Sequence, residues 1–218
     1  MNGGSTMPLL EDIKNSITTY KPAKTKEFCQ QALDEGIEPT VILSDGLIAG
    51  MAVIGEKFKL NKIYVPEVLI AARCTHAGLD ILKPILAAAK IASSGKIVLG
   101  TVKDDLHDIG KNLVAMMFEG AGFEVINLGV NVEPDKFVAA IKEHQPNIIA
   151  MSSLITSTLP NVEMTIKAII DSGLRDQVKI MVGGAPVTED WVLQIGGDGF
   201  GKDATSAVDA AKKLLGVA

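Results

Sequence analysis

The spacing of apolar positions changes once along the chain, near residue 95. Before that point apolar residues recur three and four positions apart, as at Ile13 and Ile17, which is the period of an amphipathic helix. Breaks at Pro22, Gly36 and Asn61 divide this part of the chain. The predicted helices are 8–20, 24–35, 39–57 and 65–90. Because their connections are short, we expect an N-terminal four-helix bundle.

Beyond Gly95 short apolar runs bounded by turn residues alternate with helical stretches. The predicted strands are 96–100, 123–127, 148–152 and 179–182, with a weaker fifth at 199–200. The predicted helices are 109–120, 134–144, 159–172, 188–195 and 203–215. Such alternation forms right-handed βαβ units, so the fold class is α/β, with a Rossmann-like (flavodoxin-like) five-stranded parallel sheet. We expect a helical domain at 8–92 and an α/β domain at 96–218, joined by a hinge at 91–95.

Composition narrows the classes of function. The chain is 47% apolar but only 4% aromatic, so the core has to be built from small aliphatic side chains. The net charge of −5 comes from 26 acidic and 21 basic residues of mixed order, which argues against a nucleic-acid partner. No apolar run reaches the roughly 18 residues of a membrane span, and the N-terminus lacks a signal-peptide pattern. We therefore expect a cytoplasmic protein with a small-molecule ligand and no membrane partner.

The two cysteines, Cys29 and Cys74, have no close partner in sequence and no CxxC spacing. Thiols in this context are typical of buried apolar positions rather than of a disulfide or a metal site. We expect both to fill the core.

The loop after the first predicted strand carries the strongest candidate chemistry. It places His107 two residues after Asp105 and one before Asp108, at the edge where open parallel sheets bind ligands. An imidazole that binds a metal needs an acceptor at its second nitrogen, and Asp105 is well spaced to supply it. In the alternative interpretation Asp105 or Asp108 caps the next helix, and His107 is an exposed loop residue.

Two other strand ends carry polar or glycine-rich stretches. Hydroxyl side chains from Ser152 to Thr158 follow the third strand and could bind a polar ligand, although Ser157 or Thr158 could equally be an N-cap before Pro160. Gly183 and Gly184 follow the fourth strand and allow close approach, or simply form a tight turn. Four more glycines at 196–201 are a weaker signal. Together these stretches predict a large slot at one edge of the sheet.

Common nucleotide and phosphotransfer sites do not match these strand ends. Neither GxGxxG nor GxxxxGK[ST] follows the first strand, so dinucleotide binding and nucleotide hydrolysis are disfavoured. A response-regulator receiver needs an aspartate at the end of the third strand, where this chain has Met151 and Ser152.

Three motifs together resemble the signature of cobalamin (corrinoid) binding domains: Asp105-x-His107-x-x-Gly110, Ser152-x-Leu154 and Gly183-Gly184. The helical half resembles the cap of methyl-carrying members at Gly50-Met51, at 55–58 and at 64–67. The similarity covers about residues 8 to 215. It points to the corrinoid proteins of anaerobic methyltransferase systems and the matching modules of methionine synthase.

The resemblance implies a role for each motif residue. His107 would be the lower axial ligand of cobalt, in the base-off/His-on state, with Asp105 on its other ring nitrogen and Thr158 extending the pair to a relay. Ser152 and Thr156 would bind the nucleotide tail. The further cofactor-binding residues that it implies are Asp108, Ile109, Gly110, Leu154, Gly183, Gly184, Phe200 and Ala204, with Tyr64 and Val65 over the upper face. The chain departs from the family at Asp104, where glycine is usual, and at Leu106, where valine is more common.

The implied function is that of a carrier that does not turn over alone. The bound corrinoid would take a methyl group from a donor-specific methyltransferase and pass it to an acceptor methyltransferase that uses tetrahydrofolate or coenzyme M. A reductive activase would be a third partner. The alternatives are a cobalamin-dependent sensor or regulator, for whose output segment we see no spare residues, and the small subunit of a carbon-skeleton mutase.

Overall fold

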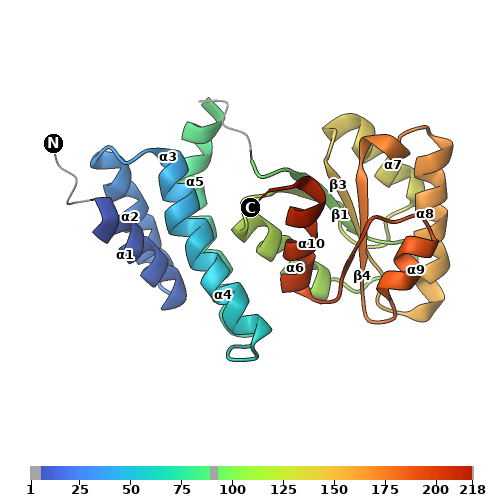
Figure 1. The fold of residues 1–218 in the computed structure, drawn as a ribbon, viewed down its shortest axis with the longest axis horizontal. Coiled ribbons are helices and arrows are strands. Elements are labelled where there is room, and N and C mark those ends of the chain that lie inside the picture. The colour runs from blue at the N-terminus through green and yellow to red at the C-terminus, as the bar shows by residue number, and fades with distance from the viewer. Residues whose placement is uncertain (1–5, 89–92, 218) are drawn as a thin grey trace. The chain divides into compact units, whose positions relative to one another are not determined.

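The computed structural model describes residues 6–88 and 93–217, and the chain divides into two compact units (Figure 1). One unit comprises Met1–Ser93 with Gly120–Gly122, and the other comprises Ser94–Glu119 with Phe123–Ala218. The predicted hinge at 91–95 falls in part outside the described residues.

The described part of the first unit is helical throughout. Its elements are α1 (Thr6–Thr18), α2 (Pro22–Asp34), α3 (Pro39–Val41), a π-helical stretch (Ile42–Ile48), α4 (Ala49–Lys59) and α5 (Val65–Ala88). The third predicted helix is therefore one run from 39 to 59 whose middle turns widen to π-helix. Pro22, predicted as a break, begins α2, where a proline loses no helical hydrogen bond. The bundle prediction is confirmed.

The core of the helical unit uses aliphatic side chains, as the composition indicates. Ile13, Ile17, Ile42, Leu47 and Ile54 are fully buried. Helix α2 packs against α1 and α5, and α1 packs against α4.

Both cysteines belong to this core. Cys29 and Cys74 are free thiols with no exposed surface, which confirms the prediction that they fill the core. Burial raises the pKa of the Cys29 thiol to about 12, so this group stays protonated and unreactive at neutral pH.

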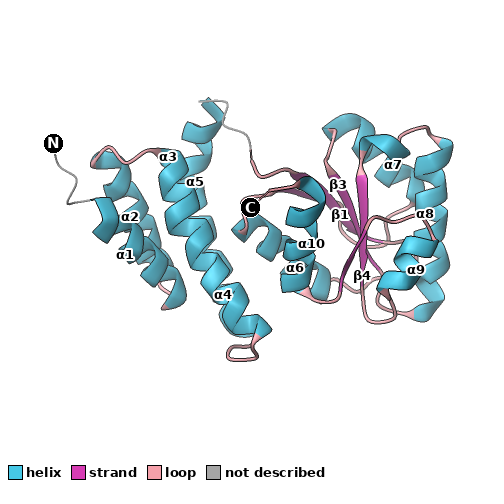
Figure 2. Cartoon of the chain, in the orientation of Figure 1, coloured by secondary structure: helices cyan, strands magenta, loops and turns pink. Residues whose placement is uncertain are grey.

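The second unit is a parallel sheet between two layers of helices (Figure 2). The strands are β1 (Lys96–Thr101), β2 (Glu124–Asn127), β3 (Ile148–Ser152), β4 (Lys179–Gly183) and β5 (Gly199–Gly201), in the order β2-β1-β3-β4-β5. The helices are α6 (Ile109–Gly120), α7 (Pro134–His144), α8 (Leu159–Asp171), α9 (Glu189–Gln194) and α10 (Ala204–Leu215). Helices α6 and α10 cover one face, and α7, α8 and α9 cover the other (Figure 1). This strand order is the flavodoxin-like one, so the α/β prediction is confirmed.

The strand order decides which loops meet. Connections from β1 run to one side of the sheet and those from β3 to the other, so the carboxyl ends of β1 and β3 form the switch point at which such sheets bind ligands. Thr101 at the end of β1 is in register with Ser152 at the end of β3, which is in register with Gly183. The three motifs of the sequence therefore lie at one edge.

Candidate functional site

The loop between β1 and α6 is held in place by its backbone. The Val102 N–H donates to the Ser152 carbonyl at 3.1 Å, and the Asn131 N–H donates to the Asp105 carbonyl at 3.0 Å. The buried Thr101 hydroxyl donates to the His107 carbonyl at 2.9 Å. These bonds tie the loop to both neighbouring strand ends and set the position of His107.

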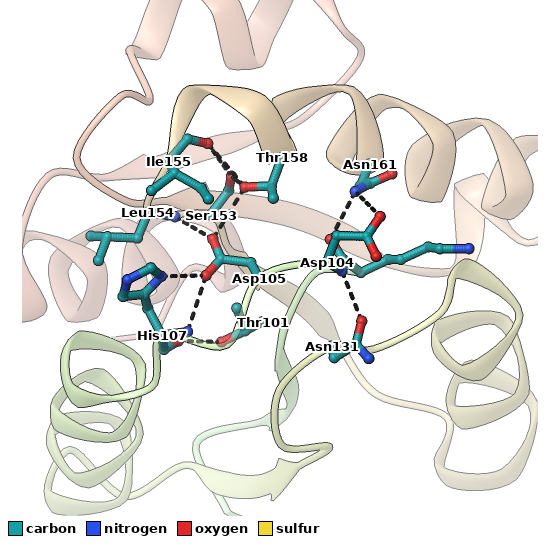
Figure 3. Close-up of polar contacts among 11 residues, drawn as sticks. Thr101, Asp104, Asp105, His107, Asn131, Ser153, Leu154, Ile155, Thr158 and Asn161 are labelled. Carbon is teal, nitrogen blue, oxygen red and sulfur yellow. Dashed lines mark hydrogen bonds and ion pairs between the residues drawn. The ribbon is translucent and has the colours of Figure 1, made fainter.

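Asp105 is the centre of the site, and its carboxylate is fully buried (Figure 3). One oxygen, Oδ1, accepts from the His107 N–H at 3.0 Å and faces His107 Nδ1 at 2.7 Å. The other, Oδ2, accepts from the Leu154 N–H at 2.7 Å and from Thr158 Oγ1 at 3.1 Å. Burial by itself raises the pKa of Asp105, but the bonds from Leu154, His107 and Thr158 outweigh it and lower the pKa below its ordinary value. Asp105 is therefore a carboxylate at neutral pH.

The geometry of His107 follows from that charge. A carboxylate only accepts hydrogen bonds, so Nδ1 carries a proton, and in the neutral imidazole Nε2 is then the nitrogen with the lone pair. The side chain is 52% exposed, and within the described part of the chain no hydrogen bond engages Nε2. A histidine held in this way through one nitrogen presents the other to a metal. The interpretation of Asp105 as a cap of α6 is wrong, because neither of its oxygens accepts a bond from that helix.

Thr158 and Ser153 extend the pair into the protein. Thr158 stands at the N-cap position of α8 with Pro160 in the first turn, as predicted, but its hydroxyl makes no capping bond because it lies against Asp105. Ser153 is fully buried, and its Oγ lies 2.8 Å from Thr158 Oγ1. The sequence indicated the hydroxyl cluster but did not single out Ser153. The result is a chain of polar groups that runs from the half-exposed His107 through buried Asp105 and Thr158 to buried Ser153.

A second polar network, missed by sequence reasoning, joins the end of β2 to the first turn of α6. Lys111 is only 3% exposed, and its Nζ donates to Asn112 Oδ1 at 2.6 Å and Asn127 Oδ1 at 2.8 Å. The Asn112 side chain donates in turn to Asp108 Oδ2 at 3.0 Å. Burial lowers the pKa of Lys111, and the charge of Asp108 partly opposes that shift. The one sequence signal was the position of Lys111 and Asn112 in the polar stretch after His107.

Exposed apolar side chains come from the loop that carries His107 and from the end of β3. Leu106, Ile109, Leu154 and Ile155 are 70%, 79%, 41% and 40% exposed, which is unusual for aliphatic residues that come from two strand ends. Gly110 lies in the first turn of α6, and a Cβ built on it would meet nothing within 4 Å. A helical glycine costs about 0.5–1 kcal/mol relative to alanine, so the fold gains nothing from it. An apolar ligand lying against this turn accounts for both features.

The side chains near His107 suit a metal that is held within a cofactor better than a bare metal ion. Within residues 6–88 and 93–217, no three His, Cys, Asp or Glu side chains converge on a common point. A metal at His107 Nε2 would therefore take most of its ligands from another molecule, as cobalt does in a corrin macrocycle. The residues present fit that group.

The backbone packed around Gly183 and Gly184 already requires glycine at both positions. Gly184 has φ +135°, and a Cβ on it would overlap the carbonyl oxygen of Ser153, so no other residue fits there. A Cβ on Gly183 would lie 2.8 Å from the Gly201 carbonyl oxygen. A further role of Gly183 and Gly184 in binding a nucleotide stays a prediction.

The structure shows where the remaining predicted residues lie, but their contacts within the chain do not test a role in cofactor binding. Ser152 is half-buried at the end of β3, and Thr156 is exposed in a short 3-10 turn. Phe200 is half-buried in β5, and Ala204 is buried at the start of α10. Tyr64 and Val65 belong to the helical unit, where the Tyr64 N–H donates to Glu67 Oε2 at 3.0 Å. Their contacts with a cofactor stay predictions.

Asp104 departs from the family pattern, and its backbone conformation explains why glycine is usual at this position. Its φ is +64°, in the left-handed region. The carboxylate turns away from the imidazole toward Asn161, whose Nδ2 lies 3.4 Å from Asp104 Oδ2 (Figure 3). The Asp104 N–H donates to Asn131 Oδ1 at 2.8 Å.

We expect Asp104→Gly to raise the free energy of unfolding of the α/β unit by about 0.5–1 kcal/mol, because glycine adopts this backbone without strain. Chemical denaturation checks the value, with Asp104→Ala as the control that keeps the Cβ and loses the carboxylate. A glycine variant less stable than the alanine variant would contradict the backbone explanation.

The fold and the site together define a cobalamin-binding protein. The B12 binding domain family matches residues 95–209, and a second B12 binding domain family matches residues 9–83. The chain is 39% identical over 209 residues to trimethylamine corrinoid protein 1 of Methanosarcina acetivorans, covering 95% of this chain and 97% of that protein. It is 38% identical over 213 residues to a corrinoid protein of Desulfitobacterium hafniense, covering 96% and 99%. The chain belongs to this family of B12-binding corrinoid proteins, and the resemblance seen in its motifs is confirmed.

Solved structures agree over both units. A cobalamin-binding protein from Desulfitobacterium hafniense superposes with a TM-score of 0.77 at 30% identity, covering 94% of this chain and 98% of that one. The methanol:cobalamin methyltransferase complex of Methanosarcina barkeri gives 0.82 at 26% identity, covering 96% and 80%. None of the helices that the structure describes is both long and apolar enough to cross a membrane.

Proposed function

We propose that the protein carries a methyl group on a corrinoid that is bound base-off, with His107 as the lower axial ligand. The observation that carries this proposal is the fully buried Asp105 carboxylate 2.7 Å from His107 Nδ1, which leaves Nε2 facing outward. When bound, the corrinoid supplies the cobalt that accepts and releases the methyl group.

The residues of the chain position and protect that group. Asp105 fixes the ring plane and the tautomer of His107. The negative charge next to Nδ1–H makes the Nε2 lone pair a stronger ligand for a metal. Thr158 and Ser153 hold Asp105 from the other side, which gives a proton on His107 a buried route of hydrogen bonds. The exposed side chains of Leu106, Ile109, Leu154 and Ile155 would become covered by the macrocycle and exclude water from Nε2.

The transfer needs partner proteins on both sides. We propose a donor-specific methyltransferase, an acceptor methyltransferase that uses tetrahydrofolate or coenzyme M, and a reductive activase, all in the cytoplasm. Several relatives are named for trimethylamine or dimethylamine, so methylamines are the first donor class to test.

The test has two stages. The purified protein is incubated with hydroxocobalamin, and its absorption spectrum is recorded after gel filtration. We expect one corrinoid per chain with a His-ligated spectrum. The loaded, reduced protein is then offered methylamines with a cognate methyltransferase, and methylcobalamin formation is followed by absorbance. A protein that binds no corrinoid refutes the proposal, and one that binds it but accepts no methyl group from any donor class favours the sensor alternative.

A further inference from the structure

The segment from Lys103 to Asp105 delivers the buried carboxylate of the site, although its residues belong to no helix or strand. Asp104, in its middle, has φ +64°, a backbone conformation that is costly for most residues. Because no strand ladder or helix pairs this backbone, its N–H and C=O groups take their partners from other parts of the chain. The residues that supply those partners help to set where the Asp105 carboxylate lies.

Asn131, in the loop between β2 and α7, binds this segment from one side. Its N–H donates to the Asp105 carbonyl at 3.0 Å, and its Oδ1 accepts from the Asp104 N–H at 2.8 Å. Asn131 has φ +51°, but glycine adopts a left-handed backbone more readily, as nearby Gly129 does at φ +87°. The backbone conformation therefore does not require asparagine at 131, whereas the bond from Asp104 does need its side-chain oxygen.

Asn161, in the first turn of α8, binds the same segment from the other side (Figure 3). Its Nδ2 donates to the Lys103 carbonyl at 2.8 Å. Asn161 comes three residues after Thr158, whose Oγ1 donates to the Asp105 carboxylate. The start of α8 therefore contacts both the carboxylate and the backbone that carries it.

We propose that Asn131 and Asn161 are positioning residues for the axial ligand His107. They fix the backbone before Asp105 from two sides, and so hold its carboxylate where it orients the imidazole. Asp105 Oδ1 lies 2.7 Å from His107 Nδ1, and a hydrogen bond weakens steeply when its geometry departs from the optimum. Loss of either asparagine bond loosens the imidazole without removing any group that touches it. The link to cobalt rests on the proposed function.

The same substitution, asparagine to aspartate, is expected to have opposite effects at the two positions. Asn131→Asp keeps an acceptor for the Asp104 N–H. Asn161→Asp replaces the donor to the Lys103 carbonyl with a group that only accepts. Both variants keep the size of the side chain and add one negative charge beside the same segment, so each is the charge control for the other.

Two further variants remove the bonds without adding charge. Asn131→Gly loses the acceptor and fits the left-handed backbone. Asn161→Ala loses the donor, and it serves in place of Asn161→Asp if that variant does not fold.

The first readout needs no corrinoid. Nitrogen NMR distinguishes the Nδ1–H tautomer of a neutral histidine from the Nε2–H tautomer. We expect wild type and Asn131→Asp to hold His107 in the Nδ1–H tautomer, because Asp105 accepts from that nitrogen. The other three variants should show a mixture of both tautomers. A bond that only stabilised the fold would leave the tautomer unchanged.

The second readout is absorption titration with hydroxocobalamin. We expect Asn131→Asp to retain the affinity and the His-ligated spectrum of the wild type. Asn131→Gly, Asn161→Asp and Asn161→Ala should bind about 3–10-fold more weakly, with a smaller His-ligated fraction.

Asn147→Ala controls for the loss of an asparagine that holds backbone elsewhere. Asn147 is exposed, as Asn131 is, and its Oδ1 accepts from the Lys96 N–H at 2.8 Å, at the opposite end of β1. Its variant should melt lower than the wild type and keep the wild-type tautomer and spectrum.

The outcomes distinguish this proposal from the proposed function. A wild-type protein that binds no corrinoid refutes the proposed function, and the tautomers still test the positioning of His107. Equal behaviour of Asn131→Asp and Asn161→Asp overturns the role of the two asparagines. A wild-type tautomer and affinity in Asn131→Gly or Asn161→Ala, or an altered tautomer in Asn147→Ala, overturns it too.

Discussion

Replacing Asp105 with asparagine is expected to lower the free energy of unfolding of the α/β unit by about 2–4 kcal/mol at pH 7. The carboxylate is fully buried and accepts from two backbone N–H groups, from His107 Nδ1 and from Thr158. An amide of the same shape accepts at one atom only and turns its own NH₂ group toward donors. Urea denaturation followed by Trp191 fluorescence measures the loss, because the one tryptophan of the chain lies in this unit.

Asp108→Asn is the matched control for that loss. Asp108 lies in the same loop but is exposed, and its carboxylate accepts from the Asn112 side chain. We expect its effect to stay within about 0.5 kcal/mol. Equal losses in the two variants would show that the buried carboxylate does not organise the loop.

The acid dependence of stability follows from the same residue. The pKa of Asp105 is lower in the folded protein than the ordinary 3.8, so the unfolded chain binds its proton first as the pH falls. Its contribution to stability is therefore complete above about pH 4 and is lost at lower pH, as the folded group takes up its proton. In this acid range the stability of Asp105→Asn should fall less steeply than that of the wild type.

Replacing His107 with alanine is expected to remove the His-ligated spectrum of the bound corrinoid and to weaken binding at least 10–100-fold, the range seen when groups that support a metal ligand are lost. Without corrinoid the stability should fall less than in Asp105→Asn, because the variant loses the bond to Nδ1 but Asp105 Oδ1 still accepts from the backbone N–H of residue 107. Absorption titration with hydroxocobalamin measures both the spectrum and the affinity. Added imidazole should restore part of the ligated spectrum in the variant.

His144→Ala controls for the loss of an imidazole elsewhere. His144 ends α7 beside Glu143 and takes no part in the site at the strand ends. Its variant should bind hydroxocobalamin with the wild-type spectrum. If His107→Ala also keeps the wild-type spectrum, the axial assignment is wrong.

The pairing of Asp105 with His107 was predictable because it is local. His107 lies only two positions after Asp105, so a single turn brings the two side chains together whatever the rest of the chain does. Thr158 lies 53 residues from Asp105, and only the resemblance to a known family linked the two before the structure placed Thr158 Oγ1 3.1 Å from the carboxylate. Motif spacing therefore supported a contact between residues close together in the chain, but not a contact between residues far apart in it.

The helices and strands were likewise predictable from the sequence where the apolar pattern extends over many residues. Helices α7, α8 and α10 and strands β1 and β3 lie within a residue or two of their predicted ranges, because their apolar periods run over enough residues to be distinctive. The π-helical turns at Ile42–Ile48 carry no such signal, and β5 has only three residues. Both depend on what packs against them.

The sequence by itself determined the two-part fold class, the end of the sheet at which the three motifs meet and the pairing of Asp105 with His107, since these follow from periodicity and from residues close together in the chain. Tertiary structure alone decided which polar groups are buried and whom they contact. Ser153 completes the chain behind Asp105, and Lys111 is enclosed by two asparagines. A residue type states which hydrogen bonds a group can make, but burial and partners are set by segments that meet only when the sheet has formed.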